Sequence, residues 1–312
     1  MHVFIDAVRT FFANLAAVDW APLALACACH AARLVVRTWA WRNILQAAFP
    51  DTRVRWRSTA GAYFAGVGVN SILPARAGDA LRAYLIKHRV DGSTYPTIAS
   101  TLVVETLFDS VVAGALLLWA LVSGALPGLD VLPKLPSIDW WWPIHHPRAA
   151  TTIAAILALA LFVGLAQAAR SGARQRFAQG FAILRRPRIR YVRGVLSWQL
   201  VSWILRLTSI YFFLLAFHVH ATLYNAFVVQ VVLSVSTVLP FTPGGAGTQQ
   251  GLLAYVFKSQ RGLIVSFSVG MNIATVVVNL AFGITSIGLM LGTLNLRKVL
   301  RRAKEATQEG GP

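Results

Sequence analysis

The sequence predicts an all-α, polytopic integral membrane protein with about five to eight membrane segments. Of its 312 residues, 56% are hydrophobic and only 13% are charged, and the mean hydropathy is +0.61. In soluble domains, about a quarter of all residues are charged. Several apolar stretches reach the roughly 20 residues that a helix needs to cross a bilayer. Two further apolar stretches are interrupted at a Leu-Pro pair, at 73–74 and at 239–240.

The excess of positive charge also fits a membrane location. The chain has 29 lysines and arginines against 11 acidic residues, a net charge of +18. A protein this basic can bind nucleic acid, but here the basic residues gather at the ends of apolar runs, as the positive-inside rule describes. We therefore expect contact with the lipid bilayer and no binding of nucleic acid. Cys27 and Cys29 point to different faces of one helix, so we predict no metal site from them, and no cofactor.

The chain divides into an amphipathic segment, 1–19, a single membrane domain, 20–296, and a basic tail, 297–312. The domain is predicted as two inverted halves, about 20–122 and 195–296, with 149–169 as the connector between them. Its apolar segments, each bounded by polar or basic residues, are 20–49, 59–73, 95–122, 149–169, 195–217, 221–240 and 262–296.

Lysine and arginine predict which ends of these segments face the cytoplasm. The linker 170–193 and the tail 297–312 are strongly basic, so both are expected inside. The loop 123–148 is rich in proline and tryptophan and carries two basic residues, so it is expected outside. The C-terminus is therefore predicted to be cytoplasmic.

Two of the segments are predicted to be re-entrant hairpins. Both flanks of 59–73 are basic, so this short segment should enter the membrane and return to the same side. The region 221–257 should do the same from the opposite side, because the span that follows it must end inside. Paired, broken segments in opposed halves are typical of transporters whose substrate site lies near the midplane. The alternative is that one or both hairpins cross fully, which gives about seven or more spans.

The first break, within 73–84, carries candidate substrate-binding residues. Asp79 suits the N-cap of the helix that begins there. Arg76 and Arg82 flank it, and the planar guanidinium group suits a phosphate headgroup. The alternative interpretation is that both arginines only mark the cytoplasmic side.

The second break is rich in glycine. Gly244, Gly245 and Gly247 can expose backbone N–H groups before a helix, and such a helix start binds anions. Three polar residues follow and can hydrogen-bond a headgroup: Thr248, Gln249 and Gln250. The alternative is a tight hairpin tip. The stretch lacks the GK[ST] ending of a nucleotide-binding loop.

Ionisable residues also occur inside the predicted spans. Glu105 and Asp109 lie on one helical face, and Arg206 lies in another span. Such residues are costly in hydrocarbon and mark functional sites by default. The carboxylates are expected to pair with Arg206, or with Arg37 and Arg42, either as a proton or headgroup relay or as a structural ion pair. Two asparagines, Asn272 and Asn279, are interpreted as hydrogen-bonding partners between helices.

The two breaks together resemble the flippase-like family that includes the transmembrane region of lysylphosphatidylglycerol synthases. The Arg37-x-Trp39-x-Trp41-Arg42 segment and the Glu105-x3-Asp109 pair resemble that family too. The resemblance covers roughly 20–296 and implies a polytopic inner-membrane protein, often linked to moving lipids or lipid-linked intermediates between leaflets. Some small stand-alone members occur in hopanoid biosynthesis. Thr106 departs from the family pattern, in which an arginine follows the glutamate.

The expected function is therefore translocation of a membrane lipid or a lipid-linked intermediate. The expected partners are an anionic or lipid-linked substrate and enzymes of a lipid pathway. Two alternatives stay open. The chain could be an intramembrane lipid transferase, for which Glu105 or Asp109 would be the general base. It could also be a scaffold in a lipid biosynthesis pathway.

Overall fold

A computed structural model of the chain describes residues 17–73, 76–122, 173–185, 191–238 and 248–291. Every regular element in these ranges is a helix, and four helical stretches are long and apolar enough to cross a membrane. The predicted all-α polytopic membrane fold is confirmed. Three predicted segments lie outside the described residues, wholly or almost so: the amphipathic start, the connector 149–169 and the basic tail.

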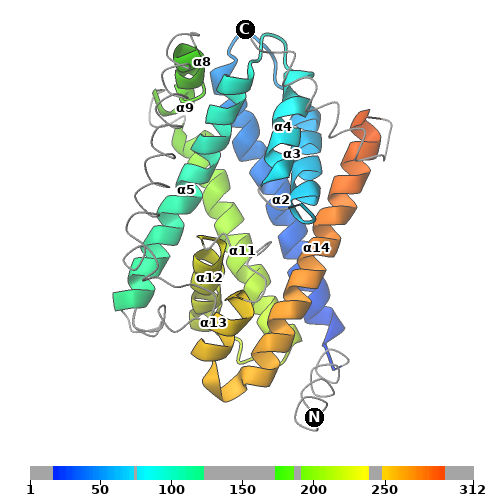
Figure 1. Ribbon diagram of the computed structural model, residues 1–312, viewed down its shortest axis with the longest axis vertical. Coiled ribbons are helices and arrows are strands. Elements are labelled where there is room, and N and C mark those ends of the chain that lie inside the picture. The colour runs from blue at the N-terminus through cyan, green and yellow to red at the C-terminus, as the bar shows by residue number, and fades with distance from the viewer. Residues whose placement is uncertain (1–16, 74–75, 123–172, 186–190, 239–247, 292–312) are drawn as a thin grey trace, which may run out of the picture.

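The four long helices run roughly side by side through the length of the molecule (Figure 1). The third of them in chain order, α11, continues from a short π-helical turn, η2 (Val192–Leu196). At 20 to 31 residues, each helix is long enough to span a bilayer of about 30 Å. The four are α2 (Trp20–Ala48), α5 (Tyr95–Val122), α11 (Ser197–Ala216) and α14 (Arg261–Leu291).

The first hairpin lies at the end of the molecule where α2 ends and α5 begins (Figure 1). It consists of α3 (Trp56–Asn70) and α4 (Ala77–Lys87), which pack against each other. With 15 residues, α3 is only about 22 Å long. It is therefore too short to cross the hydrocarbon core, as a re-entrant segment should be.

The second hairpin lies at the opposite end, where α11 ends and α14 begins (Figure 1). It consists of α12 (Leu223–Val238) and α13 (Thr248–Val256), and a 3-10 turn, η4 (Lys258–Gln260), leads into α14. Its connection, 239–247, lies outside the described residues. Each half of the chain thus has a span, a short helical hairpin and a second span, and the two hairpins occupy opposite ends.

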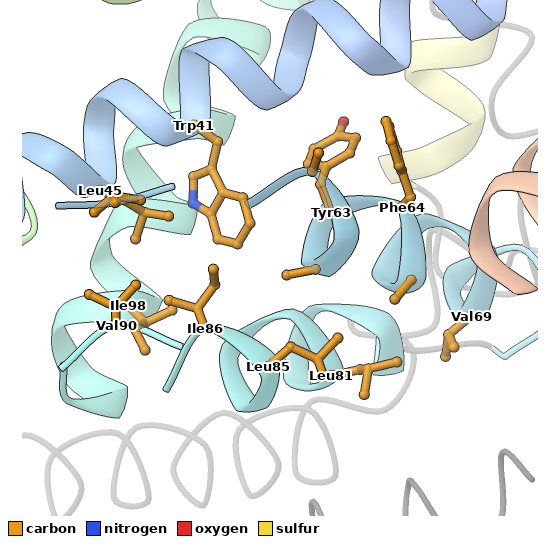
Figure 2. Packing of buried hydrophobic residues seen from close by; sticks show 14 of the residues in the cluster. Trp41, Leu45, Tyr63, Phe64, Val69, Leu81, Leu85, Ile86, Val90 and Ile98 are labelled. Atoms are coloured by element: carbon orange, nitrogen blue, oxygen red, sulfur yellow. The ribbon is translucent and has the colours of Figure 1, made fainter. Parts of the chain in front are cut away.

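Two apolar clusters hold the hairpins against the spans. Figure 2 shows the first, in which Trp41 of α2, Tyr63 of α3 and Ile86 of α4 converge. The second joins α11, α13 and α14 through Phe213, Leu253 and Phe267. By contrast, α5 exposes a stripe of large apolar side chains along most of its length, as a helix in contact with lipid should. The stripe consists of Val103, Leu107, Val111, Leu118 and Val122.

Two short helices lie beside the start of α5, at the same end of the molecule as the first hairpin (Figure 1): α8 (Ala173–Gln179) and α9 (Ala182–Arg185). They belong to the basic linker of the sequence. The hydroxyl of Thr97, at the start of α5, donates a hydrogen bond to the Arg176 carbonyl. The described part of the basic linker therefore packs against the start of α5 and the end of α2.

Candidate functional site

A buried network of charges joins the first hairpin to the spans. Its centre is Glu105, whose side chain is almost completely buried in α5. One carboxylate oxygen accepts a hydrogen bond from Arg37 of α2 at 3.1 Å, and the other accepts one from Arg82 of α4 at 2.6 Å. Three elements from different parts of the sequence are therefore joined by one carboxylate.

Arg82 makes several contacts in this network. Its guanidinium carbon lies 4.2 Å from the ring centre of Trp41 and 4.5 Å from that of Tyr63, so it packs against two adjacent aromatic rings. It also approaches Asp79 at 3.5 Å. The sequence suggested that Arg82 contacts a headgroup; here its guanidinium pairs with Glu105 and packs against the two rings, and its buried Nε has no hydrogen-bond partner among the described residues. In this arrangement Arg82 fastens the first hairpin to α2 and α5.

Asp109 extends the network to the second half of the chain. One of its oxygens accepts a hydrogen bond from Arg37 at 2.6 Å, and the other accepts one from the indole N–H of Trp203 in α11 at 2.9 Å. Gln199, one helical turn before Trp203, donates to the backbone carbonyl of Glu105 at 3.3 Å. The two acidic residues of α5 thus bind α2 and α11 at once.

A polar cavity of about 180 Å³ adjoins this network. Two arginines line it: Arg33, one helical turn before Arg37 in α2, and Arg206, one turn after Trp203 in α11. His30, Asn272 and Asn279 add further polar groups. The lining residues of α2, α11 and α14 stand near the middle of their helices, so the cavity lies near the midplane of the predicted bilayer. Its apolar wall consists of Ile210, Phe213, Leu233 and Met271.

The two cavity arginines differ from those of the network. None of the four ion pairs in the described part of the chain involves Arg33 or Arg206. The buried Nε of Arg33 has no hydrogen-bond partner among the described residues. Arg206 lies over the ring of Trp203, with 5.2 Å between its guanidinium carbon and the ring centre. The cavity therefore contains positive charge that the described carboxylates do not neutralise.

Two asparagines of α14 connect the cavity with the hairpins. Asn279 accepts a hydrogen bond from the Nε2 of His30 at 2.9 Å, in the tautomer that carries a proton there, and donates to the hydroxyl of Ser71, which ends α3. Asn272 donates to Gln249 of α13 at 3.4 Å. Both therefore act as interhelical partners, as the sequence suggested, and both also line the cavity.

Other candidate residues of the first half have different surroundings. Arg76 is exposed and adopts a left-handed backbone conformation, with φ 56°, immediately before α4. Asp79 lies in the first turn of α4 rather than at its N-cap. The side chain of Asn70 caps this helix instead, since it accepts the N–H of Gly78 at 2.7 Å. Arg42 donates to the Val54 carbonyl and forms no ion pair with Glu105 or Asp109.

The glycine-rich break of the second half lies mostly outside the described residues, including Gly244, Gly245 and Gly247. Thr248 begins α13. Gln249 is buried and donates to the Ser268 hydroxyl at 2.9 Å, whereas Gln250 is half-buried. Within the described ranges, no three metal-ligating side chains come close enough to hold an ion.

Two cavity residues, His30 and Arg33, were not singled out from the sequence as site residues. The sequence nevertheless contains a pattern from which both could be identified. His30, Arg33 and Arg37 are spaced by three and four positions, which places them on one face of a helix that must cross the membrane. Such a polar stripe on a span has to face the protein interior.

Comparisons with known proteins agree with this architecture. No solved structure matches the chain. A UPF0104 membrane protein of Methanocaldococcus jannaschii is 23% identical over 197 residues, which cover 61% of this chain and 79% of that protein. The family described as the lysylphosphatidylglycerol synthase TM region matches residues 3–283, nearly the whole chain, and the protein therefore belongs to this family of multi-pass membrane proteins.

Proposed function

We propose that this protein moves a membrane lipid or a lipid-linked intermediate between the two leaflets of the cell inner membrane, with its C-terminus in the cytoplasm. The observation that carries the proposal is the polar cavity at mid-span, between hairpins that lie at opposite ends of the molecule. A lipid headgroup must cross the apolar core, and a polar chamber at its centre lowers the cost of that passage. Membership of a family named for a lipid synthase region gives the proposal further support.

The arrangement favours transport over catalysis by the acidic pair. A general base needs an oxygen directed at the substrate proton. Both oxygens of Glu105 accept hydrogen bonds from arginines, and both oxygens of Asp109 accept hydrogen bonds from Arg37 and Trp203. These four interactions hold helices together, so the two carboxylates are better suited to a structural role than to a transferase reaction.

The proposal can be tested by filling the cavity. Thr275 lines the cavity on α14, and a tryptophan there should block it. Thr285 lies on the same helix and is exposed, so Thr285→Trp is a matched control. Purified protein is reconstituted into vesicles that contain a fluorescent phosphatidylglycerol in both leaflets. A membrane-impermeant reductant bleaches the outer leaflet, and the slow loss of the remaining signal reports translocation.

Wild-type protein and Thr285→Trp should accelerate translocation over protein-free vesicles, whereas Thr275→Trp should abolish the acceleration. Equal rates for Thr275→Trp and wild type would refute passage through this cavity. A wild-type rate no faster than that of empty vesicles, across phosphatidylglycerol, phosphatidylethanolamine and a lipid-linked diphosphate, would refute the transport function itself.

A further inference from the structure

We propose that the central cavity is a binding site for one phosphate ester group, held by Arg33 of α2 and Arg206 of α11. This inference deepens the proposed function and rests on it for the source of the phosphate, a lipid headgroup. The residues that carry it are those of the cavity and not the two broken loops. The sequence had pointed to the loops for anion binding.

The first argument is charge. Around the cavity and the adjoining network stand four arginines and three carboxylates, and Arg37 and Arg82 form all the ion pairs with the latter. Arg33 and Arg206 are left without a carboxylate among the described residues. A charge removed from water costs several kcal/mol unless a counter-ion is near. The cavity therefore provides a place for an anion.

The second argument is the type of donor. An arginine presents a planar set of N–H groups that matches two oxygens of a phosphate or a carboxylate. The buried Nε of Arg33 has no hydrogen-bond partner among the described residues, so these residues leave the guanidinium group incompletely satisfied. Two guanidinium groups from different helices can hold a tetrahedral phosphate from two sides. They also repel a headgroup that ends in an amine.

The third argument is size. A pocket that encloses a whole drug-sized ligand measures about 300–1,000 Å³. The cavity, at about 180 Å³, accommodates a phosphate with a small substituent but not acyl chains. Phe213, Leu233 and Met271 form the apolar part of its lining. A headgroup in the cavity would therefore leave its chains along the apolar surface between the helices.

The fourth argument is connection to the hairpins. His30 and Asn279 lead to Ser71 at the end of α3, and Asn272 leads to Gln249 in α13. Each asparagine amide uses one N–H in these bonds and keeps a second for the cavity. A bound phosphate would thus be one hydrogen bond away from both hairpins, as a substrate that passes between them requires.

Binding is measured on the purified full-length protein in an uncharged detergent and a phosphate-free buffer. The probes are dihexanoyl phosphatidylglycerol, inorganic phosphate and dihexanoylglycerol, which lacks the phosphate. Titration calorimetry should give saturable binding of the phospholipid and none of the neutral lipid. Arg33→Gln and Arg206→Gln should each weaken phospholipid binding by about tenfold or more. Arg57→Gln, which removes an exposed arginine of α3, should leave it unchanged.

Several outcomes separate the possibilities. Inorganic phosphate that binds as tightly as the phospholipid, with the same dependence on Arg33 and Arg206, would support the site but assign it to the free anion. Equal binding of the phospholipid and the neutral lipid, or unchanged binding in both glutamine variants, would overturn the proposal. Should these variants not yield folded protein, Arg33→Lys and Arg206→Lys keep the charge but lose the two-pronged geometry, and they must still bind the phospholipid more weakly than wild type.

The binding titration and the transport assay together distinguish failure of the phosphate site from failure of the proposed transport function. Arginine-dependent binding without translocation would retain the site and refute the transport function. Translocation at the wild-type rate in Arg33→Gln and Arg206→Gln, together with unchanged phospholipid binding, would retain the function and refute the site.

Discussion

At the scale of single residues, burial determines how much each carboxylate of the network contributes. Glu105 is buried between two arginines that are themselves buried. The side chain of Asp79 is 28% exposed and lies 3.5 Å from Arg82. Removing one partner of a buried ion pair leaves an uncompensated charge, whereas an exposed pair contributes little. The same chemical change should therefore have very different effects at the two positions.

We predict that Glu105→Gln lowers the free energy of unfolding by about 3 kcal/mol or more, because Arg37 and Arg82 would lose their shared counter-ion. Asp79→Asn should lower it by about 1 kcal/mol or less. Both can be measured by titration with a denaturing detergent, followed by tryptophan fluorescence. A similar loss in the two variants would show that Glu105 is not the counter-ion of these arginines.

The sequence showed which charged residues face the protein interior, but it did not show which of them pair with each other. The spacing of Glu105 and Asp109 predicted that both face the interior, and Arg37 was among the partners considered. The spacing could not predict that Arg37 pairs with both carboxylates while Arg206 forms no ion pair with a described residue, because that depends on how α2 and α11 are rotated against α5. The spacing of Arg33 and Arg37 predicts that Arg33 faces the protein interior, but it does not predict that Arg33 and Arg206 line one cavity.

At the scale of elements, glycines allow the first hairpin to contact the last span closely. A Cβ atom added to Gly68 of α3 would lie 2.7 Å from the Cα of Gly283 in α14. Helices in membranes gain van der Waals contact when small residues let their backbones approach. This crossing fixes α3 against α14 next to Ser71, and therefore next to the bond from Asn279.

We predict opposite effects for two glycine-to-alanine substitutions. Gly68→Ala should destabilise the protein by about 1–3 kcal/mol, because the backbone of α14 cannot move away easily. A Cβ at Gly114 of α5 meets nothing within 4 Å, so Gly114→Ala should be neutral or slightly stabilising through its better helix propensity. Thermal unfolding in detergent checks both. A neutral Gly68→Ala would mean that the helices are not in such close contact.

The existence of both hairpins could be predicted from segment length and flanking charge, but their details could not. The start of α4 is an example. Asp79 has the residue type of an N-cap, yet Asn70 provides the capping oxygen from the preceding helix. The short connection between α3 and α4 brings Asn70 to Gly78, so a residue of the preceding helix caps α4 in place of Asp79.

At the scale of the whole molecule, the two hairpins approach one cavity from opposite ends. Asn272 and Asn279 are about 10 Å apart along α14, because each residue advances a helix by about 1.5 Å. Ser71, directly after α3, and Gln249, near the start of α13, bond to these two asparagines. Thus described residues close to each of the two breaks, Ser71 and Gln249, bond to residues that line the same cavity.

This arrangement predicts that the two ends of the molecule face different compartments. Asp91, beside the first hairpin, is exposed, and Ser259, beside the second, is exposed too. In a background of Cys27→Ser and Cys29→Ser, Asp91→Cys should react with a membrane-impermeant maleimide only in inside-out vesicles, because its end carries the basic flanks. Ser259→Cys should react only in right-side-out vesicles. The reversed pattern would invert the predicted sidedness and retain the opposed hairpins. Labelling of both cysteines from one side would refute the inverted architecture on which the proposed transport function depends.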